Sequence, residues 1–271
     1  MPRIVELRVP PEDAELAADR LWAAGARAVE LIDGPGRAAA RSVLADDDDV
    51  SRRCLGALPP GWQLTFLDVP DEPSEAWRDF ATPIEVSPTL VIRPAWLPAG
   101  VPRDGVLEVA IEPGGAFGLG DHPTTRLSAA AVERLVRPRD RVLDVGCGSG
   151  VLAIIAARLG AGQVTAIDIA EAAREATLAN AAANGVADRV AASVDPLERV
   201  DGTFDLVLAN ILAPALVALA PDLVRATAPR GTLVISGVLV DGHDHVVAAL
   251  APLRPVRVDQ LDGWAAIELR R

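Results

Sequence analysis

The chain has 271 residues, half of them hydrophobic, and a formal net charge of −12. A chain of this length buries one large core or two modest ones, and no apolar run in it approaches the roughly 18 residues that a membrane helix needs. Because phosphate binding requires a basic surface, the acidic balance disfavours a nucleic-acid partner. Acidic residues near the amino terminus stand where a signal peptide would be basic and apolar. We therefore expect a cytoplasmic protein that binds neither membrane nor nucleic acid.

The residue types exclude several kinds of site. Cys54 and Cys147 are the only cysteines, and their number and spacing suit neither a disulfide framework nor a zinc site. The chain contains no lysine and no tyrosine, which removes a Schiff-base lysine, a P-loop lysine and a Tyr–Lys dehydrogenase pair. We expect no metal site. The acidic surface suits a basic partner, although acidity also serves solubility alone.

The first 70 residues predict a small α+β domain. We expect one helix over residues 11–25, and strands over residues 3–10, 26–33, 40–46 and 61–69. A polar, proline-containing stretch follows, and we interpret residues 71–95 as a linker with a short helix around Trp77. A β-like segment over residues 84–96 leads out of this linker.

From residue 139 onwards, predicted strands and helices alternate. Buried strands with helices between them are expected near residues 140–145, 163–170, 187–194, 204–211 and 232–239. A last helix over 243–253 and two strands over 254–263 and 264–271 close the chain. The alternation predicts a Rossmann-like α/β fold, in which a doubly wound, mostly parallel sheet carries a final hairpin. We assign residues 96–271 to this domain.

The stretch DVGCGSG joins the first of these strands to a helix that opens near Ser149. Glycines such as Gly146 and Gly148 let a ligand approach the backbone, and a helix N-terminus favours an anionic group. The nicotinamide fingerprint GxGxxG would require a glycine at Val151. The observed spacing, preceded by Asp144, instead suits S-adenosylmethionine, whose carboxylate can meet backbone N–H groups while Asp144 meets its ammonium group.

Two polar residues end neighbouring strands of the predicted sheet. Asp168 ends the second strand, where an acid accepts hydrogen bonds from a ribose diol. Asn210 ends the fourth strand and points toward the same crevice, where its amide can hold the cofactor or the incoming nucleophile. Each has a structural alternative, because Asp168 and Asn210 can also cap the helices that follow them. Asp195, after the third strand, is a candidate adenine contact or a loop residue.

Several stretches, taken in order, resemble the ribosomal protein L11 methyltransferase family. They are GGAFGLGDHPTTRL, VLDVGCGSGVLAIIAARLGA, AIDI, NAAANGV and LVLANILAPALVALAP, with EAWRDFATPIEV and LVIRPAW upstream of them. The resemblance is looser over the N-terminal domain. It implies an S-adenosylmethionine-dependent enzyme that methylates lysine ε-amines and the N-terminal amine of a large-subunit ribosomal protein, with the N-terminal domain recognising the substrate. It also implies that Thr125, Gly146, Asp168 and Asn210 contact the cofactor.

The resemblance implies that residues 116–125 form a loop that covers the cofactor, with Phe117 near it. This loop runs into a helix for which Thr124 or Thr125 would be the N-cap. His122 is a candidate for metal binding or proton transfer, but no second ligand stands at a suitable spacing.

One departure from the family pattern lies inside this loop. Where the family has Thr-Gly-Thr, this chain has Leu119, Gly120 and Asp121. If Asp121 faces the pocket, it favours a cationic substrate or the sulfonium of the cofactor; if it faces solvent, it caps the turn. The departure leaves cofactor use intact and leaves the substrate open.

Methyl transfer to an amine is expected to depend on positioning. A free lysine has a pKa near 10.4, and desolvation in an apolar pocket favours its neutral, nucleophilic form. Aligning the nucleophile with the methyl group can then supply most of the catalysis, and Asn210 is the candidate catalytic residue for this alignment. The alternatives are a related enzyme acting on another protein or a small molecule, a non-catalytic binding module of the same fold, and a nicotinamide oxidoreductase, which the glycine spacing disfavours.

Overall fold

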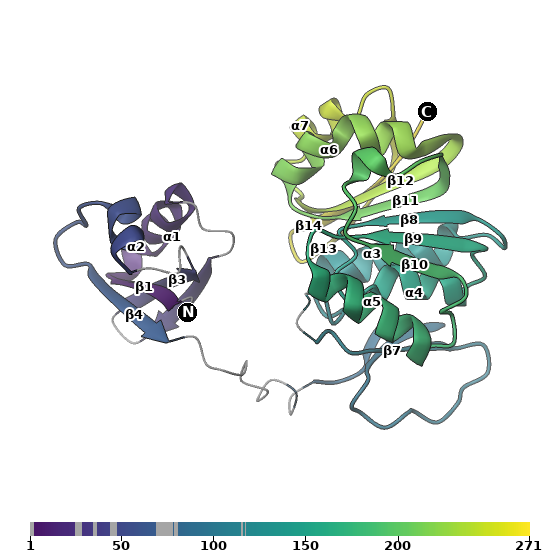
Figure 1. Cartoon of the computed structure of the whole chain (residues 1–271), viewed down its shortest axis with the longest axis horizontal. Helices are drawn as coiled ribbons and strands as arrows, with labels where there is room; N and C mark the ends of the chain where they lie inside the picture. The colour runs from purple at the N-terminus through teal and green to yellow at the C-terminus, as the bar shows by residue number, and fades with distance from the viewer. Residues whose placement is uncertain are drawn as a thin grey trace. The chain divides into compact units, whose positions relative to one another are not determined.

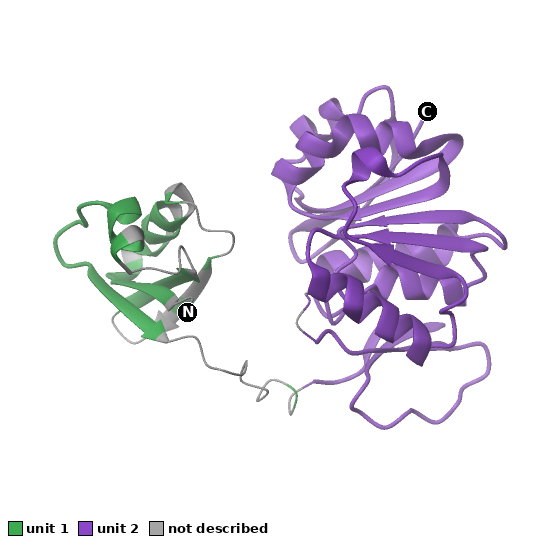
Figure 2. Ribbon diagram, viewed as in Figure 1, with its two compact units in different colours: residues 1–80 green, residues 81–271 purple. Residues whose placement is uncertain are grey.

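The computed structural model describes residues 3–24, 29–34, 37–43, 48–68, 78, 81–114, 116 and 118–271. The chain divides into two compact units, Met1–Phe80 and Ala81–Arg271 (Figure 2). Trp77, with the short helix predicted around it, lies outside the described residues. Residues 84–94, at the end of the predicted linker, form strands within the second unit. The linker predicted over residues 71–95 stays a prediction.

The first unit is the predicted α+β domain, a four-stranded antiparallel sheet with helices (Figure 1). Its elements are β1 Arg3–Val9, η1 Pro11–Asp13, α1 Ala14–Ala23, β2 Glu30–Gly34, β3 Arg37–Val43, α2 Asp48–Leu55 and β4 Gln63–Asp68. The strand order is β2-β3-β1-β4. Val5, Leu7 and Val9 alternate along β1 and are buried with Leu21 of α1 and Leu55 of α2, because successive strand residues point to opposite faces.

The second unit begins with a small sheet that leads into the site. Its strands are β5 Ile84–Ser87, β6 Leu90–Pro94 and β7 Leu107–Ile111. β5 and β6 are antiparallel, whereas β6 and β7 are parallel. The sequence analysis did not predict β7. After β7, residues 112–122 run to α3, Pro123–Leu135.

The larger sheet of this unit has the order β10-β9-β8-β11-β12-β14-β13. Its strands are β8 Arg141–Val145, β9 Gln163–Ile167, β10 Val190–Ser193, β11 Phe204–Asn210, β12 Thr227–Leu239, β13 Arg254–Leu261 and β14 Trp264–Arg270. The first five are parallel and β14 is antiparallel to both neighbours, which confirms the predicted hairpin at the end of a parallel sheet. The strand order reverses between β8 and β11, where doubly wound sheets bind ligands.

Helices cover both faces of this sheet (Figure 1). They are α4 Val151–Arg158, α5 Glu171–Ala183, η3 Leu197–Arg199, α6 Ala213–Ala226 and α7 Asp244–Ala249. One core joins α3, α4 and α5 to the sheet, and a second core on the opposite face joins α6 and α7 to it. Residues alternate between the two cores along β8, with Val142 in the first and Leu143 in the second. In the part of the chain that the structure describes, no helix is long and apolar enough to span a membrane.

Candidate functional site

A cavity of about 480 Å³ lies at the carboxyl ends of β8, β9 and β11. Val145 pairs with Ile167 of β9 and with Ala209 of β11, so the residues that follow these three strands meet at one level of the sheet edge. The cavity is lined mainly by apolar side chains and by backbone of the glycine loop, with few polar groups. These polar side chains include those of Thr125, Asp168, Asp195 and Asn210.

The glycine loop adopts a conformation that requires glycine. Gly146, Gly148 and Gly150 have φ of 73°, 54° and 80°, in the left-handed region that other residues avoid. A Cβ on Gly146 would lie 2.3 Å from Cγ2 of Ile211, so this glycine is also required by close packing. The Gly146 amide donates to the carbonyl oxygen of Ile167 at 2.8 Å, which fixes the loop to β9. The helix predicted near Ser149 begins at Val151.

Cys147 lies in the wall of the cavity and is buried. Burial raises the pKa of its thiol to about 12, and the negative charge of Asp144 adds to this effect. Because the thiolate is the nucleophilic form of cysteine, Cys147 is not a nucleophile near neutral pH.

Asp168 lines the cavity at the end of β9. Its Oδ2 accepts from the Gly148 amide at 3.0 Å, and its Oδ1 accepts from the Ala170 amide at 3.0 Å. Ala170 itself is the N-cap of α5. The carboxylate is thus held against the glycine loop, at the position predicted to meet a ribose, and is not the cap of the helix.

Asn210 and Thr125 meet in the wall of the same cavity. Nδ2 of Asn210 lies 3.3 Å from Oγ1 of Thr125, a residue 85 positions away in the sequence. The N-cap of α6 is Leu212, and no side chain bonds to this helix end. The structure therefore brings together two predicted site residues and leaves Asn210 without the capping role that was its alternative.

Asp144 lies behind the glycine loop. It is 1 % exposed, and its Oδ2 accepts from the Ala153 amide in the first turn of α4 at 3.2 Å. Burial, with a smaller contribution from the negative charge of Asp168, raises the pKa of Asp144 to about 7, although the Ala153 bond favours the ionised form. Asp144 is not one of the residues that line the cavity, so its predicted contact with an ammonium group stays a prediction.

The segment before α3 differs from its prediction at the helix cap. The N-cap is His122, whose Nδ1 accepts from the Thr124 amide at 3.3 Å and lies 2.8 Å from Oγ1 of Thr124. The prediction of Thr124 or Thr125 as the cap was wrong, because Pro123 at the first helical position shifts the helix start to its own position. The His122 ring also packs edge-on against Trp264, with 5.1 Å between ring centroids. No group of three or more metal-ligating side chains occurs among the described residues.

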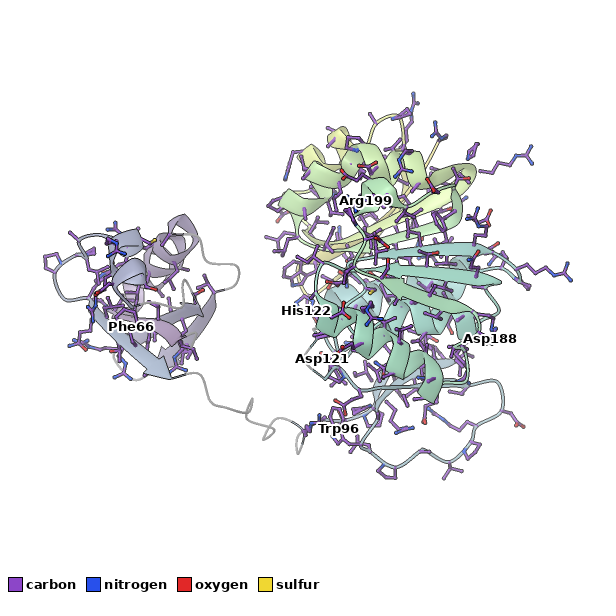
Figure 3. The ribbon with its side chains drawn as sticks, viewed as in Figure 1. Phe66, Trp96, Asp121, His122, Asp188 and Arg199 are labelled. Atoms are coloured by element: carbon purple, nitrogen blue, oxygen red, sulfur yellow. The ribbon has the colours of Figure 1, made fainter. Side chains whose placement is uncertain are left out.

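Gly118 brings this segment to the cavity wall, where its carbonyl oxygen accepts from Oγ of Ser149 at 2.5 Å. Asp121, beside His122 in Figure 3, is exposed and lines a separate depression next to β5 and β6. The cap of α3 is His122, and a contact of Asp121 with a cationic substrate stays a prediction. Phe117 lies outside the described residues.

Apolar wall residues are the part of the site that the sequence analysis missed. Ile169 directly follows Asp168, lines the cavity and is 96 % exposed. Leu197 and Ile211 form other parts of the wall. An isoleucine placed immediately after a strand-end acid was the available signal, because large apolar residues in loops are normally partly covered.

These residues fit S-adenosylmethionine. The cavity volume lies in the range of small-molecule sites, and its apolar wall at Ile169 and Leu197 suits an adenine ring. Asp168 supplies an acceptor for ribose hydroxyls, and the helix N-terminus at Gly150 suits a carboxylate. A doubly wound sheet with this glycine loop and this acid on the next strand defines an S-adenosylmethionine-dependent methyltransferase.

Comparison with known proteins specifies the family. A family model described as Ribosomal protein L11 methyltransferase (PrmA) matches residues 64–271. The chain is similar to the ribosomal protein L11 methyltransferase of Pelotomaculum thermopropionicum, at 35% identity over 98% of this chain and 97% of that protein. Similarity to the enzyme of the same name from Syntrophotalea carbinolica is 43% over 79% of this chain and 72% of that protein.

A solved structure agrees with these sequences. The chain is similar to the ribosomal protein L11 methylase of Lactobacillus delbrueckii subsp. bulgaricus, with a TM-score of 0.66 and 35% identity over 70% of this chain and 99% of that one. The chain belongs to the ribosomal protein L11 methyltransferase (PrmA) family.

Proposed function

We propose that this methyltransferase transfers methyl groups from S-adenosylmethionine to amino groups of ribosomal protein L11, on lysine side chains, on the N-terminal amine or on both. The names of its relatives support this substrate. A net charge of −12 suits a basic protein partner and disfavours nucleic acid. Because the proposed substrate is a ribosomal protein, we propose that the reaction takes place in the cytoplasm.

We assign cofactor binding to the residues at the edge of the sheet. Gly146 and Gly148 present backbone to the cofactor's amino-acid end, and Asp168 accepts from its ribose. Thr125 and Asn210 hold the reacting end. Asp144 supports the loop through its bond to Ala153 and stays a candidate partner of the ammonium group. Phe117 stays a candidate contact from the loop after β7.

The observation that carries the proposed mechanism is the contact between Asn210 and Thr125 in a mainly apolar cavity wall. When bound, S-adenosylmethionine supplies a methyl group on a positively charged sulfur. Because Nδ2 of Asn210 is directed to Thr125, its Oδ1 is the atom that accepts a hydrogen bond from the incoming amine. This bond orients the amine lone pair toward the methyl group.

The substrate must lose a proton before it reacts. Deprotonating a lysine at pH 7 costs roughly 4–5 kcal/mol, and desolvation by an apolar wall lowers that cost. The wall at Ile211 and Leu212 beside Asn210 supplies such desolvation. Alignment contributes up to about 7–11 kcal/mol to catalysis, so the mechanism needs no dedicated base in the cavity.

Two variants separate binding from catalysis at this site. We expect Asn210→Ala to lower turnover about 100-fold or more, because an unoriented amine loses much of the alignment advantage, while circular dichroism shows an unchanged fold. Asp168→Ala should weaken binding of S-adenosylhomocysteine at least tenfold in calorimetry, because it removes a charged acceptor. Unchanged turnover rejects the role of Asn210, and wild-type affinity rejects that of Asp168.

The substrate is tested with ribosomal proteins from cells that lack this gene. Purified enzyme and S-adenosylmethionine labelled in its methyl group are added, and the label is located by gel and mass spectrometry. Because the enzyme has no lysine, its own side-chain amines cannot take up the label. A labelled L11 band is expected. Label on other proteins or on small molecules, or no transfer despite measurable cofactor binding, would reject L11 as the substrate.

A further inference from the structure

Helix α5 carries a row of polar side chains on its buried face. Thr177 and Asn180 are 0 % and 2 % exposed, and Asn184 follows one turn later as the C-cap residue. Asparagine is a poor choice for a buried helix position unless its amide is fully hydrogen-bonded. None of these side chains lines the cofactor cavity, so the site described above does not account for them.

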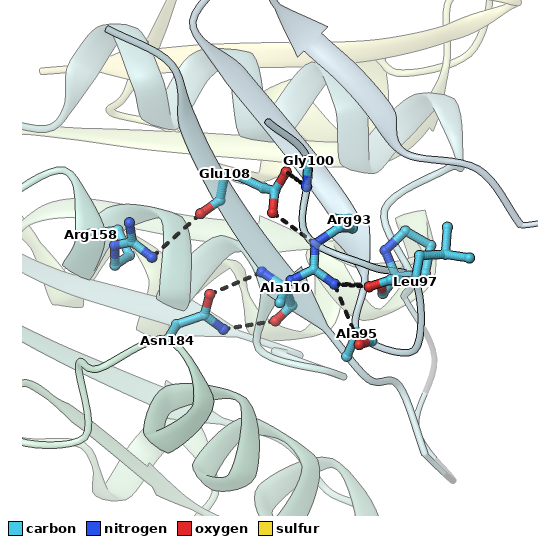
Figure 4. A network of polar contacts seen from close by, with 9 residues as sticks. Arg93, Ala95, Leu97, Gly100, Glu108, Ala110, Arg158 and Asn184 are labelled. Atoms are coloured by element: carbon cyan, nitrogen blue, oxygen red, sulfur yellow. Dashed lines mark hydrogen bonds and ion pairs between the residues drawn. The ribbon is translucent and has the colours of Figure 1, made fainter. Parts of the chain in front are cut away.

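Two of these side chains complete the outer edge of β7. Asn184 accepts from the Ala110 amide at 2.9 Å and donates to the Ala110 carbonyl oxygen at 2.7 Å (Figure 4). Asn180 makes the same pair of bonds two residues further on, accepting from the Glu112 amide at 3.0 Å and donating to its carbonyl oxygen at 2.9 Å. Side-chain amides thus replace the backbone of a missing neighbouring strand.

The third hydrogen bond of the Asn180 side chain goes to the glycine loop, which Asn184 does not reach. Its Nδ2 donates to the carbonyl oxygen of Ser149 in the glycine loop at 2.8 Å. Thr177, on the same helix face, donates to the carbonyl oxygen of Gly148 at 3.2 Å. The inner face of α5 therefore holds the glycine loop from the side opposite to the cavity.

The segment after β7 is bound to the glycine loop at two points. Asn180 ties Glu112, at the start of the segment, to Ser149, and Oγ of Ser149 donates to the carbonyl oxygen of Gly118 further along it. Gly118, Thr125 and the glycine loop all contribute to the cavity wall. The buried amide of Asn180 and the hydroxyl of Ser149 thus join two backbone segments that both contribute to the cavity wall.

We propose that Asn180 is a positioning residue of the cofactor site, which helps to hold Glu112 and Gly118 against the glycine loop so that the cavity is formed before the cofactor binds. This inference rests on the proposed cofactor site. Its physical basis is preorganisation, since a wall that is already ordered loses less conformational entropy when the ligand binds. Asn180 itself touches neither cofactor nor substrate.

Asn184 provides a matched control. Each asparagine makes three side-chain hydrogen bonds, because Asn184 also donates to the Asn180 carbonyl oxygen at 2.8 Å. Each asparagine bonds to the amide and the carbonyl oxygen of one backbone residue, Asn184 to those of Ala110 in β7 and Asn180 to those of Glu112 just after β7. Only Asn180 also reaches the glycine loop. A purely structural role predicts similar effects of Asn180→Ala and Asn184→Ala on ligand binding.

The experiment compares Asn180→Ala, Asn184→Ala and Ser149→Ala in the full chain. Calorimetry with S-adenosylhomocysteine gives Kd, and hydrogen exchange without ligand gives the protection of amides in residues 116–122. We expect Asn180→Ala to raise Kd at least tenfold and to reduce this protection, and Ser149→Ala to raise Kd roughly threefold. Asn184→Ala should change Kd less than twofold while lowering Tm.

Equal changes in Kd for Asn180→Ala and Asn184→Ala, or wild-type protection of residues 116–122 in Asn180→Ala, would overturn the inference. If Asn180→Ala does not fold, Asn180→Asp decides, because it keeps an acceptor for the Glu112 amide and removes the amide donor to the Ser149 carbonyl oxygen. Wild-type Kd and protection in that variant would overturn the inference. The cofactor site itself is tested separately, by the binding of S-adenosylhomocysteine to Asp168→Ala. Weakened binding in Asp168→Ala together with equal effects of the two asparagine variants would reject only the role of Asn180.

Discussion

Two buried carboxylates on interior strands, one from each unit of the molecule, have opposite kinds of partner. Glu6 on β1 is 0 % exposed and lies opposite Arg41 on β3. Arg41 and Arg8 donate to its two oxygens at 2.6 and 2.5 Å. Asp144 on β8 is equally buried, but its protein hydrogen bond comes from a neutral backbone amide. The difference is the presence or absence of a positive partner.

The pKa values follow from this difference. Burial raises the pKa of Glu6, but the hydrogen bonds and charges of Arg41 and Arg8 outweigh burial, so its pKa lies below the ordinary value. For Asp144 burial prevails and the pKa rises to about 7. A buried acid with two arginines strengthens a sheet. Asp144, a buried acid without an arginine partner, lies beside the cofactor site, where groups with strongly perturbed pKa values are often found.

The largest effect that tests the comparison is expected from Glu6→Ala. This change leaves Arg8 and Arg41 without their buried partner, and we expect the first unit to lose roughly 2–4 kcal/mol of unfolding free energy, because breaking a buried ion pair is strongly destabilising. Chemical denaturation followed by circular dichroism and calorimetry measures the loss. A loss below about 0.5 kcal/mol would mean that the pair contributes only what exposed pairs do.

A smaller and pH-dependent effect is expected from Asp144→Asn. Because the folded pKa of Asp144, about 7, is higher than the unfolded value near 3.8, the native state binds the proton more tightly. Its contribution to stability is present below pH 4 and is lost as the pH rises toward 7. The asparagine side chain keeps an acceptor for the Ala153 amide, and the variant loses this dependence of stability on pH. We expect it to gain about 1–3 kcal/mol relative to wild type between pH 5 and pH 8.

The measurement is urea denaturation of both proteins at several pH values between 4 and 8. Parallel curves for wild type and Asp144→Asn would show that the carboxyl is not protonated in the folded protein. Glu6 provides the opposite sign as an internal reference. Because its folded pKa is lowered, its contribution is present above about pH 4.5 and is lost as the pH falls through the folded value.

The smallest effect is expected from Arg8→Ala. The side chain of Arg8 is 52% exposed, whereas that of Arg41 is 33% exposed. Water can replace the more exposed partner, so Arg8→Ala should cost no more than about 1 kcal/mol. Arg41→Ala should cost more than Arg8→Ala in the same denaturation assay. If Arg8→Ala cost more than Arg41→Ala, the main partner of Glu6 would be Arg8, which lies on the same strand.

Much of the second unit was predictable because its signals are local. Each parallel strand is a short apolar run, each helix begins soon after a strand, and Asp168 and Asn210 mark strand ends. The structure confirms the alternating elements and brings Asp168, Asn210, Gly146 and Gly148 into one cavity wall. This works because the carboxyl ends of adjacent parallel strands meet at one sheet edge.

The unpredicted parts depend on contacts between distant residues. β7 was missed because its five residues pair with β6 on one edge, and Ala110 bonds to Asn184 on the other. The cap at His122 was missed because threonine occupies helix N-cap positions more often than histidine does. The position of Asp144 behind the loop depends on its bond to Ala153, nine residues later.

The asparagine pair on α5 also has a consequence for biosynthesis. Asn184 lies 74 residues after Ala110, the β7 residue whose outer edge it completes. At roughly 5–20 residues per second, a ribosome needs about 4–15 s to make that stretch. Until then the nascent β7 presents unpaired backbone groups, the kind of edge that recruits other strands. In this enzyme, whose family acts on a ribosomal protein, the rate of translation therefore sets how long the edge of β7 stays unpaired.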